Sequence, residues 1–75
     1  MDEQTFNAKI YHAEVMRDIS DRPDYWAGYC RGLRRAFHGE RFGTEEEHVL
    51  WSSFYELPDE QCRERGRGYL DAIES

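Results

Sequence analysis

The chain has 75 residues, of which 39% are hydrophobic and 35% are charged, and its formal net charge is −6. A single small domain of this length, residues 1–75, buries only about 60 to 65% of the surface that its unfolded chain exposes, which leaves little room for a deep active site. No stretch of the sequence approaches the roughly 20 apolar residues that span a bilayer, so we expect no membrane-spanning segment.

The amino terminus is acidic and lacks an apolar run, which predicts a cytoplasmic protein without a signal peptide. The two cysteines, Cys30 and Cys62, fall on the apolar faces of expected helices, where a free thiol packs as a small hydrophobe. We therefore expect both cysteines to be reduced rather than joined in a disulfide.

The first predicted element is a helix over residues 4–20, because apolar side chains recur there at helical spacing. These side chains are Phe6, Ile10, Ala13 and Met16, with Val15 and Ile19 widening the stripe. A strand over residues 4–12 is the alternative, because apolar and polar side chains also alternate along that segment.

The second predicted helix runs from about Asp24 to His38 and follows a break at residues 20–23. Either Asp21 or Asp24 can cap it. Gly39 is expected to end this helix with a positive φ. Small residues recur at every fourth position and form a strip where another backbone can approach, and an apolar ridge lies beside the strip. The strip is Gly28, Gly32 and Ala36, and the ridge is Trp26, Cys30, Leu33 and Phe37.

Thr44 begins a third predicted helix with the capping-box pattern Thr-x-x-Glu, which Glu47 completes. Three glutamates in the first turn suit the positive end of the helix dipole, and the helix is expected to stop near Glu56. Its side chains indicate a wide apolar face. That face is Val49, Leu50, Trp51, Phe54 and Tyr55.

Pro58 fits the opening of a fourth helix from about Asp59 to Ile73. Gly66 and Gly68 each weaken a helix by about 1 kcal/mol relative to alanine, so we expect this one to be split or frayed. The apolar positions of this helix are Cys62, Tyr69, Leu70 and Ile73. The predicted fold is an all-α bundle of three to four short helices centred on residues 24–38, and α+β with an N-terminal strand is the alternative.

Five side chains can ligate zinc, but their spacing forms no Cys-x-x-Cys or His-x-x-x-His pair. They are His12, His38, His48, Cys30 and Cys62. Ser52 and Ser53 lie in a predicted helix without the glycine elbow of a nucleophilic serine. The sequence therefore predicts no catalytic residue, no metal site and no cofactor.

Four arginines lie within residues 25–43 among aromatic side chains, a pattern that can contact nucleic acid. They are Arg31, Arg34, Arg35 and Arg41. The glutamates at the start of the next helix would repel phosphate, which argues against this use. We favour internal pairing of the arginines with the acidic stretch 44–60.

Residues 44–60 carry six acidic side chains and no basic one. They are Glu45, Glu46, Glu47, Glu56, Asp59 and Glu60. Such a surface can imitate phosphates and occupy a basic groove on a partner protein. The sequence thus predicts a non-enzymatic protein that binds a macromolecule. A nucleic-acid-binding protein using the arginine patch, and a homodimer using exposed Tyr25, Tyr29 or Tyr55, are the alternatives.

The pattern YWxGYxRGLRRxxHGxxFGTxxEHxxW, from Tyr25 to Trp51, covers about a third of the chain. It resembles short open reading frames of bacteria and of their phages or prophages, to which no activity is attached. The resemblance implies a mobile-element setting in a bacterial cytoplasm, where tiny acidic proteins often bind and block a host machine. In size and charge alone the chain is similar to anti-CRISPR proteins. The function that follows is an inhibitor of a host nucleic-acid-binding machine, with no site residue carried over.

Overall fold

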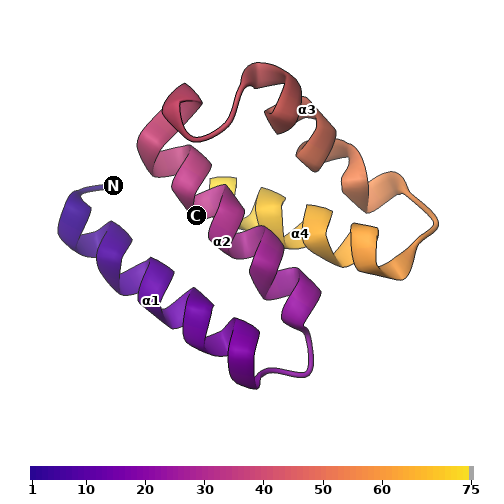
Figure 1. Cartoon of the computed structure of the whole chain (residues 1–75), viewed down its shortest axis with the longest axis horizontal. Helices are drawn as coiled ribbons and strands as arrows, with labels where there is room; N and C mark the ends of the chain where they lie inside the picture. The colour runs from indigo at the N-terminus through magenta and orange to yellow at the C-terminus, as the bar shows by residue number, and fades with distance from the viewer. Residues whose placement is uncertain (75) are drawn as a thin grey trace.

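The computed structural model describes residues 1–74, which fold into four α-helices and two short 3-10 helices (Figure 1). The elements are α1 (Glu3–Ile19), α2 (Pro23–His38), η1 (Gly39–Arg41), α3 (Glu45–Ser53), η2 (Phe54–Glu56) and α4 (Glu60–Glu74). No strand occurs in the described part of the chain, and residues 4–12 are helical. The all-α prediction is confirmed, and the alternative of an N-terminal strand is not.

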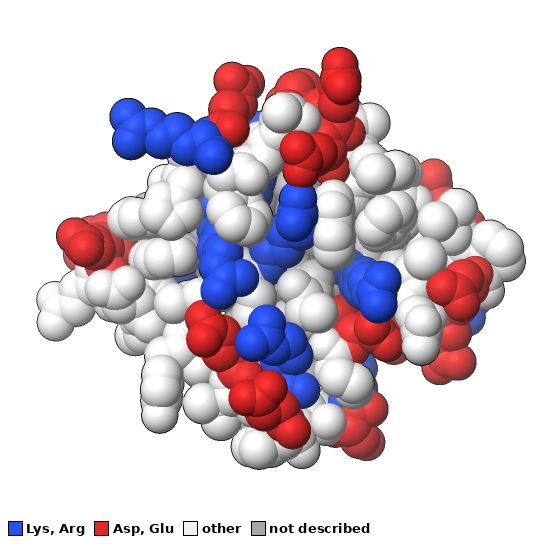
Figure 2. Space-filling view, viewed as in Figure 1, with Lys and Arg blue, Asp and Glu red and all other residues white. Residues whose placement is uncertain are grey.

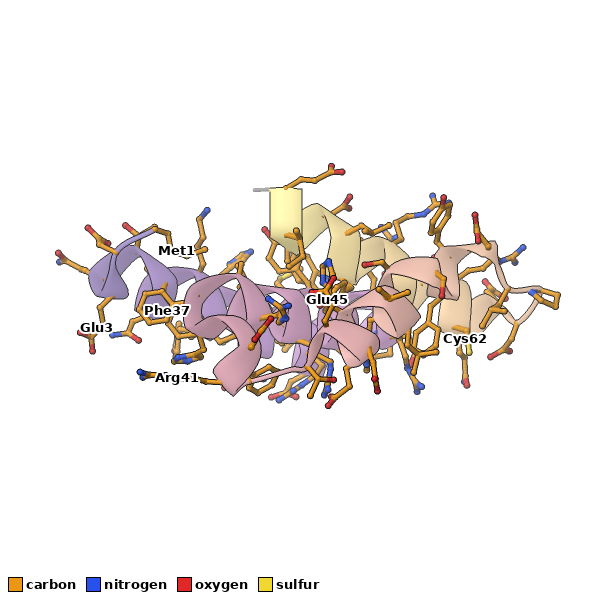
Figure 3. All side chains as sticks on the ribbon, turned by 90° about the horizontal axis from the view of Figure 1, so that it is seen from above. Met1, Glu3, Phe37, Arg41, Glu45 and Cys62 are labelled. Carbon is orange, nitrogen blue, oxygen red and sulfur yellow. The ribbon has the colours of Figure 1, made fainter. Side chains whose placement is uncertain are left out.

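Helix α2 lies at the centre of the molecule, as predicted. It crosses in front of α4, and α1 and α3 flank this pair on opposite sides (Figure 1). Helix α1 packs against α2, whereas α3 and η2 pack against α4. The result is a flat molecule with extents of 36 × 30 × 16 Å, seen edge-on in Figure 3.

The backbones of α2 and α4 touch where they cross. A Cβ atom on Gly28 would overlap the carbonyl oxygen of Arg65, and a Cβ atom on Gly68 would overlap that of Tyr25. A Cβ atom on Gly32 would lie 2.5 Å from the carbonyl oxygen of α4 at position 69. Only glycine permits this approach, so these positions set the distance between the two helices.

Two expectations about small residues are wrong. Helix α4 is continuous through Gly66 and Gly68, because each glycine lies where another backbone comes close rather than in open solvent. At Gly66 a Cβ atom would lie 2.8 Å from the Cβ atom of Phe54 in η2. Ala36, the third member of the predicted strip on α2, is exposed. The predicted strip is therefore confirmed at Gly28 and Gly32 but not at Ala36.

The core is small and lies between α1, α2 and α4. Its buried apolar side chains are Phe6, Ala13, Cys30, Leu33, Tyr69 and Ala72. The predicted ridge of α2 is confirmed, because Trp26 and Phe37 are half-buried and pack against this core. Phe37 also stacks on Phe6, with ring centroids 4.4 Å apart. Ile19 was expected to widen the apolar stripe of α1, but it is 73% exposed, because it points away from α2, the main packing partner of α1.

The predicted caps of α2 are half right. Gly39 ends the helix with a φ of 67°, the positive value expected, although its ψ of −145° lies outside the left-handed helical region. At the other end neither Asp21 nor Asp24 is the cap, because Pro23 occupies the first turn and Arg22 is the N-cap, without a side-chain hydrogen bond. Asp24 instead accepts a hydrogen bond from Nε of Arg65 at 3.1 Å, which ties α2 to α4.

Candidate partner-binding face

Helix α3 begins where the sequence predicts. The Thr44 hydroxyl accepts a hydrogen bond from the backbone N–H of Glu47 at 3.1 Å, which is half of the predicted capping box. The Glu47 carboxylate does not complete the box: it accepts hydrogen bonds from the Thr44 hydroxyl at 3.4 Å and from Nη2 of Arg31 at 2.6 Å. The cap therefore orients Glu47 toward α2.

Polar contacts hold α3 against the rest of the molecule. No residue of α3 is buried. Arg35 donates to Glu45 at 3.3 Å and Arg31 donates to Glu47, so two arginines of α2 fasten the first turn of α3. Further along, Nδ1 of His48 lies 2.8 Å from the hydroxyl of Tyr69, a buried residue of α4. Helix α3 is thus attached by hydrogen bonds along one side.

The Arg31 guanidinium is enclosed by two aromatic rings as well as by a carboxylate. It lies 4.8 Å from the ring centroid of Trp51 and 5.3 Å from that of Phe42. Cation–π attraction of this kind adds to the ion pair with Glu47. This arrangement anchors the middle of α3 to α2.

The predicted arginine patch is mostly paired within the molecule. Besides Arg31 and Arg35, Arg34 donates to Glu14 of α1 at 3.0 Å. Arg41 belongs to no ion pair within residues 1–74 and extends away from the ribbon in Figure 3. Figure 2 shows basic side chains gathered near the middle of one face with acidic side chains beside them. Internal pairing therefore accounts for three of the four arginines, although Arg34 pairs with α1 rather than with the stretch 44–60.

The apolar face predicted for the third helix is largely uncovered. Trp51 and Phe54 are half-buried, but several other apolar side chains of the segment are exposed. Their exposed fractions are 58% for Val49, 53% for Leu50, 45% for Tyr55 and 40% for Leu57. Three members of the predicted face, Val49, Leu50 and Tyr55, are therefore uncovered, because α3 lies at the edge of a flat molecule and packs mainly against α4. Leu57 was not part of that prediction.

The six predicted acidic residues fall into two groups. Glu45 and Glu47 are used to hold α3 in place. The other four are exposed, and none of the ion pairs in residues 1–74 includes them: Glu46, Glu56, Asp59 and Glu60. Hydrogen bonds from the thiol and the backbone N–H of Cys62 lower the pKa of Asp59, so this carboxylate stays ionised.

These four carboxylates and four exposed apolar side chains belong to one segment, which runs along one edge of the molecule from α3 through η2 to the start of α4 (Figure 1). We refer to the eight residues as the α3–η2 face. Apolar side chains surrounded by uncompensated charge of one sign are a typical composition for a protein-binding surface.

A shallow depression of about 410 Å³ lies within this region. Its lining residues come from α3 and η2, and they are Glu45, His48, Val49, Ser52, Ser53, Tyr55 and Glu56. The hydroxyl oxygen of Ser52 is buried and has no hydrogen-bond partner within the described residues. This depression was not predicted, because its serines and Tyr55 form no recognisable sequence motif; their nearness in the chain was the one available signal.

The candidate metal ligands lie apart from one another. His12 and His38 each pack edge-on against aromatic rings, those of Trp26 and Phe37 respectively, while His48 contacts Tyr69. Both cysteines are free: Cys30 is buried, which raises the pKa of its thiol, and Cys62 is half-buried. Residues 1–74 contain no group of three or more histidine, cysteine or acidic side chains arranged to hold a metal ion.

The three tyrosines considered for a homodimer differ in exposure. Tyr25 is half-buried and its hydroxyl donates to Asp71 at 2.6 Å, while Tyr29 is half-buried and packs against the core. Tyr55 is exposed and belongs to the α3–η2 face. Of these three tyrosines, the exposed one therefore lies in the same segment as the unpaired carboxylates.

No protein family, curated protein or solved structure matches this chain. No helix in residues 1–74 combines the length and the apolar character needed to cross a bilayer. The functional argument therefore rests on the geometry and charge of the α3–η2 face.

Proposed function

We propose that this chain is a non-enzymatic protein that binds another protein through the α3–η2 face. The observation that carries the proposal is the combination of four exposed apolar side chains with four carboxylates that have no internal ion-pair partner. Apolar surface supplies the affinity, and the uncompensated negative charge selects a partner surface that is basic.

A basic partner is favoured over a second copy of this chain. In a two-fold dimer the same patch faces itself, so an α3–η2 dimer would bring four carboxylates of one copy against four of the other. Like charges brought together in this way weaken an interface. The charge of the face therefore supports a different protein with a basic groove.

The most concrete form of the proposal is an inhibitor from a phage or other mobile element that blocks a nucleic-acid-binding machine in the cytoplasm of a bacterial host, as anti-CRISPR proteins do. In this role Glu46, Glu56, Asp59 and Glu60 stand where the phosphates of a nucleic acid would bind. The support is the resemblance carried by residues 25–51 together with the negative charge of the exposed edge.

Direct nucleic-acid binding through the arginine patch is disfavoured by the same geometry. Arg31, Arg34 and Arg35 would have to exchange a carboxylate that each already contacts for a phosphate. A gel-shift titration at low salt tests this alternative, because sequence-independent phosphate contacts are strongest there. We expect no retardation of DNA or RNA; retardation abolished by Arg41→Gln would instead support the arginine patch.

The proposal is tested by reversing charge on the face. We compare the parent with the triple variant Glu46→Lys, Glu56→Lys, Glu60→Lys, as bait in nuclease-treated bacterial lysate at increasing salt. The matched control is Asp18→Lys, Glu40→Lys, Glu74→Lys, which changes net charge equally at exposed positions outside the face. Glu45 and Glu47 are left intact because reversing them would also detach α3.

We expect the parent and the control variant to retain the same host protein, and the face variant to lose it. The complex should dissociate as salt screens the charges, and DNA should compete if the partner surface is a nucleic-acid groove. Equal retention by both variants, or retention that does not depend on salt, would refute the proposed use of the face.

A further inference from the structure

The chain twice builds the same cation-binding arrangement from its own residues. The Arg31 guanidinium contacts the Glu47 carboxylate at 2.6 Å and lies over the rings of Trp51 and Phe42. In each arrangement a guanidinium donates to a carboxylate and lies over an aromatic ring. This combination of partners suits the planar group of arginine better than the ammonium of lysine.

The second arrangement lies between the start of α2 and α4. Arg22 contacts the Glu64 carboxylate at 2.7 Å, and its guanidinium lies 4.3 Å from the ring centroid of Tyr25. The hydrogen bond from Arg22 to Glu64 also raises the pKa of Arg22. Here the carboxylate belongs to α4 and the ring to α2.

The depression beside α3 contains the same two components without an arginine. Tyr55 and Glu56 both line it, Tyr55 is exposed, and Glu56 takes part in none of the ion pairs formed by residues 1–74. Ser52 and Ser53 also contribute to the lining.

We propose that this depression receives the side chain of an arginine on the partner protein, an inference that rests on the proposed function and names the group that the face recognises. The guanidinium donates to Glu56 and lies against the ring of Tyr55. Glu45 is already paired with Arg35, so the lining has one uncompensated carboxylate, Glu56, which matches one guanidinium. The volume of about 410 Å³ accommodates one long side chain.

Arginine is distinguished from lysine by its planar group. The ammonium of lysine is compact and strongly hydrated, so it gains less from a ring and cannot donate two parallel hydrogen bonds to a carboxylate. From the strength of cation–π contacts at exposed sites, we expect an arginine peptide to bind about two- to five-fold more tightly than a lysine peptide of equal charge.

The test is a titration of the isotope-labelled protein with hexa-arginine and, separately, hexa-lysine at one ionic strength, followed by amide chemical shifts. We expect hexa-arginine to shift the amides of Ser52, Ser53, Tyr55 and Glu56 and to show the stated preference. Glu56→Gln and Tyr55→Leu should each bring the arginine-to-lysine affinity ratio close to one. Glu74→Gln, which removes a carboxylate at the far end of α4, should leave the ratio unchanged.

Three results would overturn the arginine site: equal affinity for the two peptides, shifts confined to other parts of the chain, or an equal loss of preference in Glu56→Gln and Glu74→Gln. These results do not bear on charge reversal of the whole face, which tests the proposed function separately. If charge reversal abolishes partner binding but the titration shows no preference for arginine, the proposed function is supported and the arginine site is refuted.

Discussion

The α2–α4 crossing and the α3–η2 segment are held by different kinds of contact. At the crossing, backbone meets backbone through Gly28 and Gly68, beside the buried side chain of Leu33. Helix α3 has no buried residue and is held by hydrogen bonds with α2 and α4 and by contacts of the Trp51 ring with Arg31 and Tyr69. We therefore expect the crossing to contribute most of the free energy of folding, which would leave the α3–η2 segment available for the proposed recognition.

The largest effect is expected at the crossing. Gly68→Leu places a side chain where the carbonyl oxygen of Tyr25 lies, so the helices must separate or the fold is lost. We expect a loss of more than about 3 kcal/mol in the free energy of unfolding, a large part of the stability of a small domain. Gly32→Leu should act in the same direction, because its Cβ atom would meet the backbone of α4. Thermal unfolding followed by circular dichroism measures both.

Gly43→Ala is the control for these glycine variants. Gly43 is also buried, but a Cβ atom there would lie 3.5 Å from Cδ of Arg35, an ordinary contact. We expect a change within about 0.5 kcal/mol. If Gly68→Leu melts like this control, the crossing is not the element that determines stability.

A matched pair of leucines compares the two regions directly. Leu33→Ala removes a fully buried side chain from the core and should lower the free energy of unfolding by about 2 to 5 kcal/mol. Leu50→Ala makes the same chemical change on the exposed side of α3 and should cost no more than about 0.5 kcal/mol. Chemical denaturation of the two variants measures the difference, and similar losses would show that Leu50 is covered in solution.

The polar attachment of α3 is expected to be weaker and local. Arg31→Met removes the ion pair with Glu47 and the contacts with two rings, which together contribute about 1 kcal/mol for a partly exposed group. Amide hydrogen exchange should become faster in α3 while exchange in α2 and α4 stays near that of the parent. Arg63→Met, at an exposed position of α4, is the control. Faster exchange throughout the molecule would mean that α3 is part of the global folding unit.

The smallest effect concerns Tyr25, which links α2 to α4 beside the crossing. Burial and the hydrogen bond to Asp71 raise the pKa of Tyr25 to about 12. The unfolded chain loses this proton near its ordinary pKa of 10.0, so the stabilising contribution is complete below that pH and is lost as pH rises toward about 12.

Because Tyr25 is partly exposed, we expect this contribution to be less than about 1 kcal/mol. The melting temperatures of the parent and of Tyr25→Phe, compared between pH 9 and pH 11.5, isolate it from the other tyrosines, including Tyr69, whose pKa is also raised by burial. The parent should lose more stability than the variant over this range. Parallel pH profiles would contradict the assigned hydrogen bond.

Helix positions followed from local signals. The start of α3 depends on the Thr44 cap and the end of α2 on Gly39, and both effects act within one turn of the chain, so sequence analysis located them. The cap of α2 was misplaced because Pro23 starts a helix by restricting φ, without needing a side-chain acceptor. Local signals thus predict where a helix lies more reliably than which residue caps its first backbone N–H groups.

The candidate site was predicted only in part. Residues 44–60 were identified from composition, but composition does not separate Glu45 and Glu47, which hold arginines of α2, from Glu46 and Glu56, which do not. The separation depends on which carboxylates face α2, and that requires the position of one helix relative to another. The depression lined by Ser52 could not be predicted for the same reason, because its shape depends on how α3 and η2 are placed in space.

The four helices and the central place of the second could be predicted from the sequence, because apolar spacing and capping depend on neighbouring residues, but a strand over residues 4–12 stayed open. Only the tertiary structure decided which glycines are contacts rather than weak points, as at Gly66 and Gly68 in α4. It also decided that Val49 and Leu50 are exposed, because a periodic apolar pattern marks a face of a helix but not the neighbour that covers it.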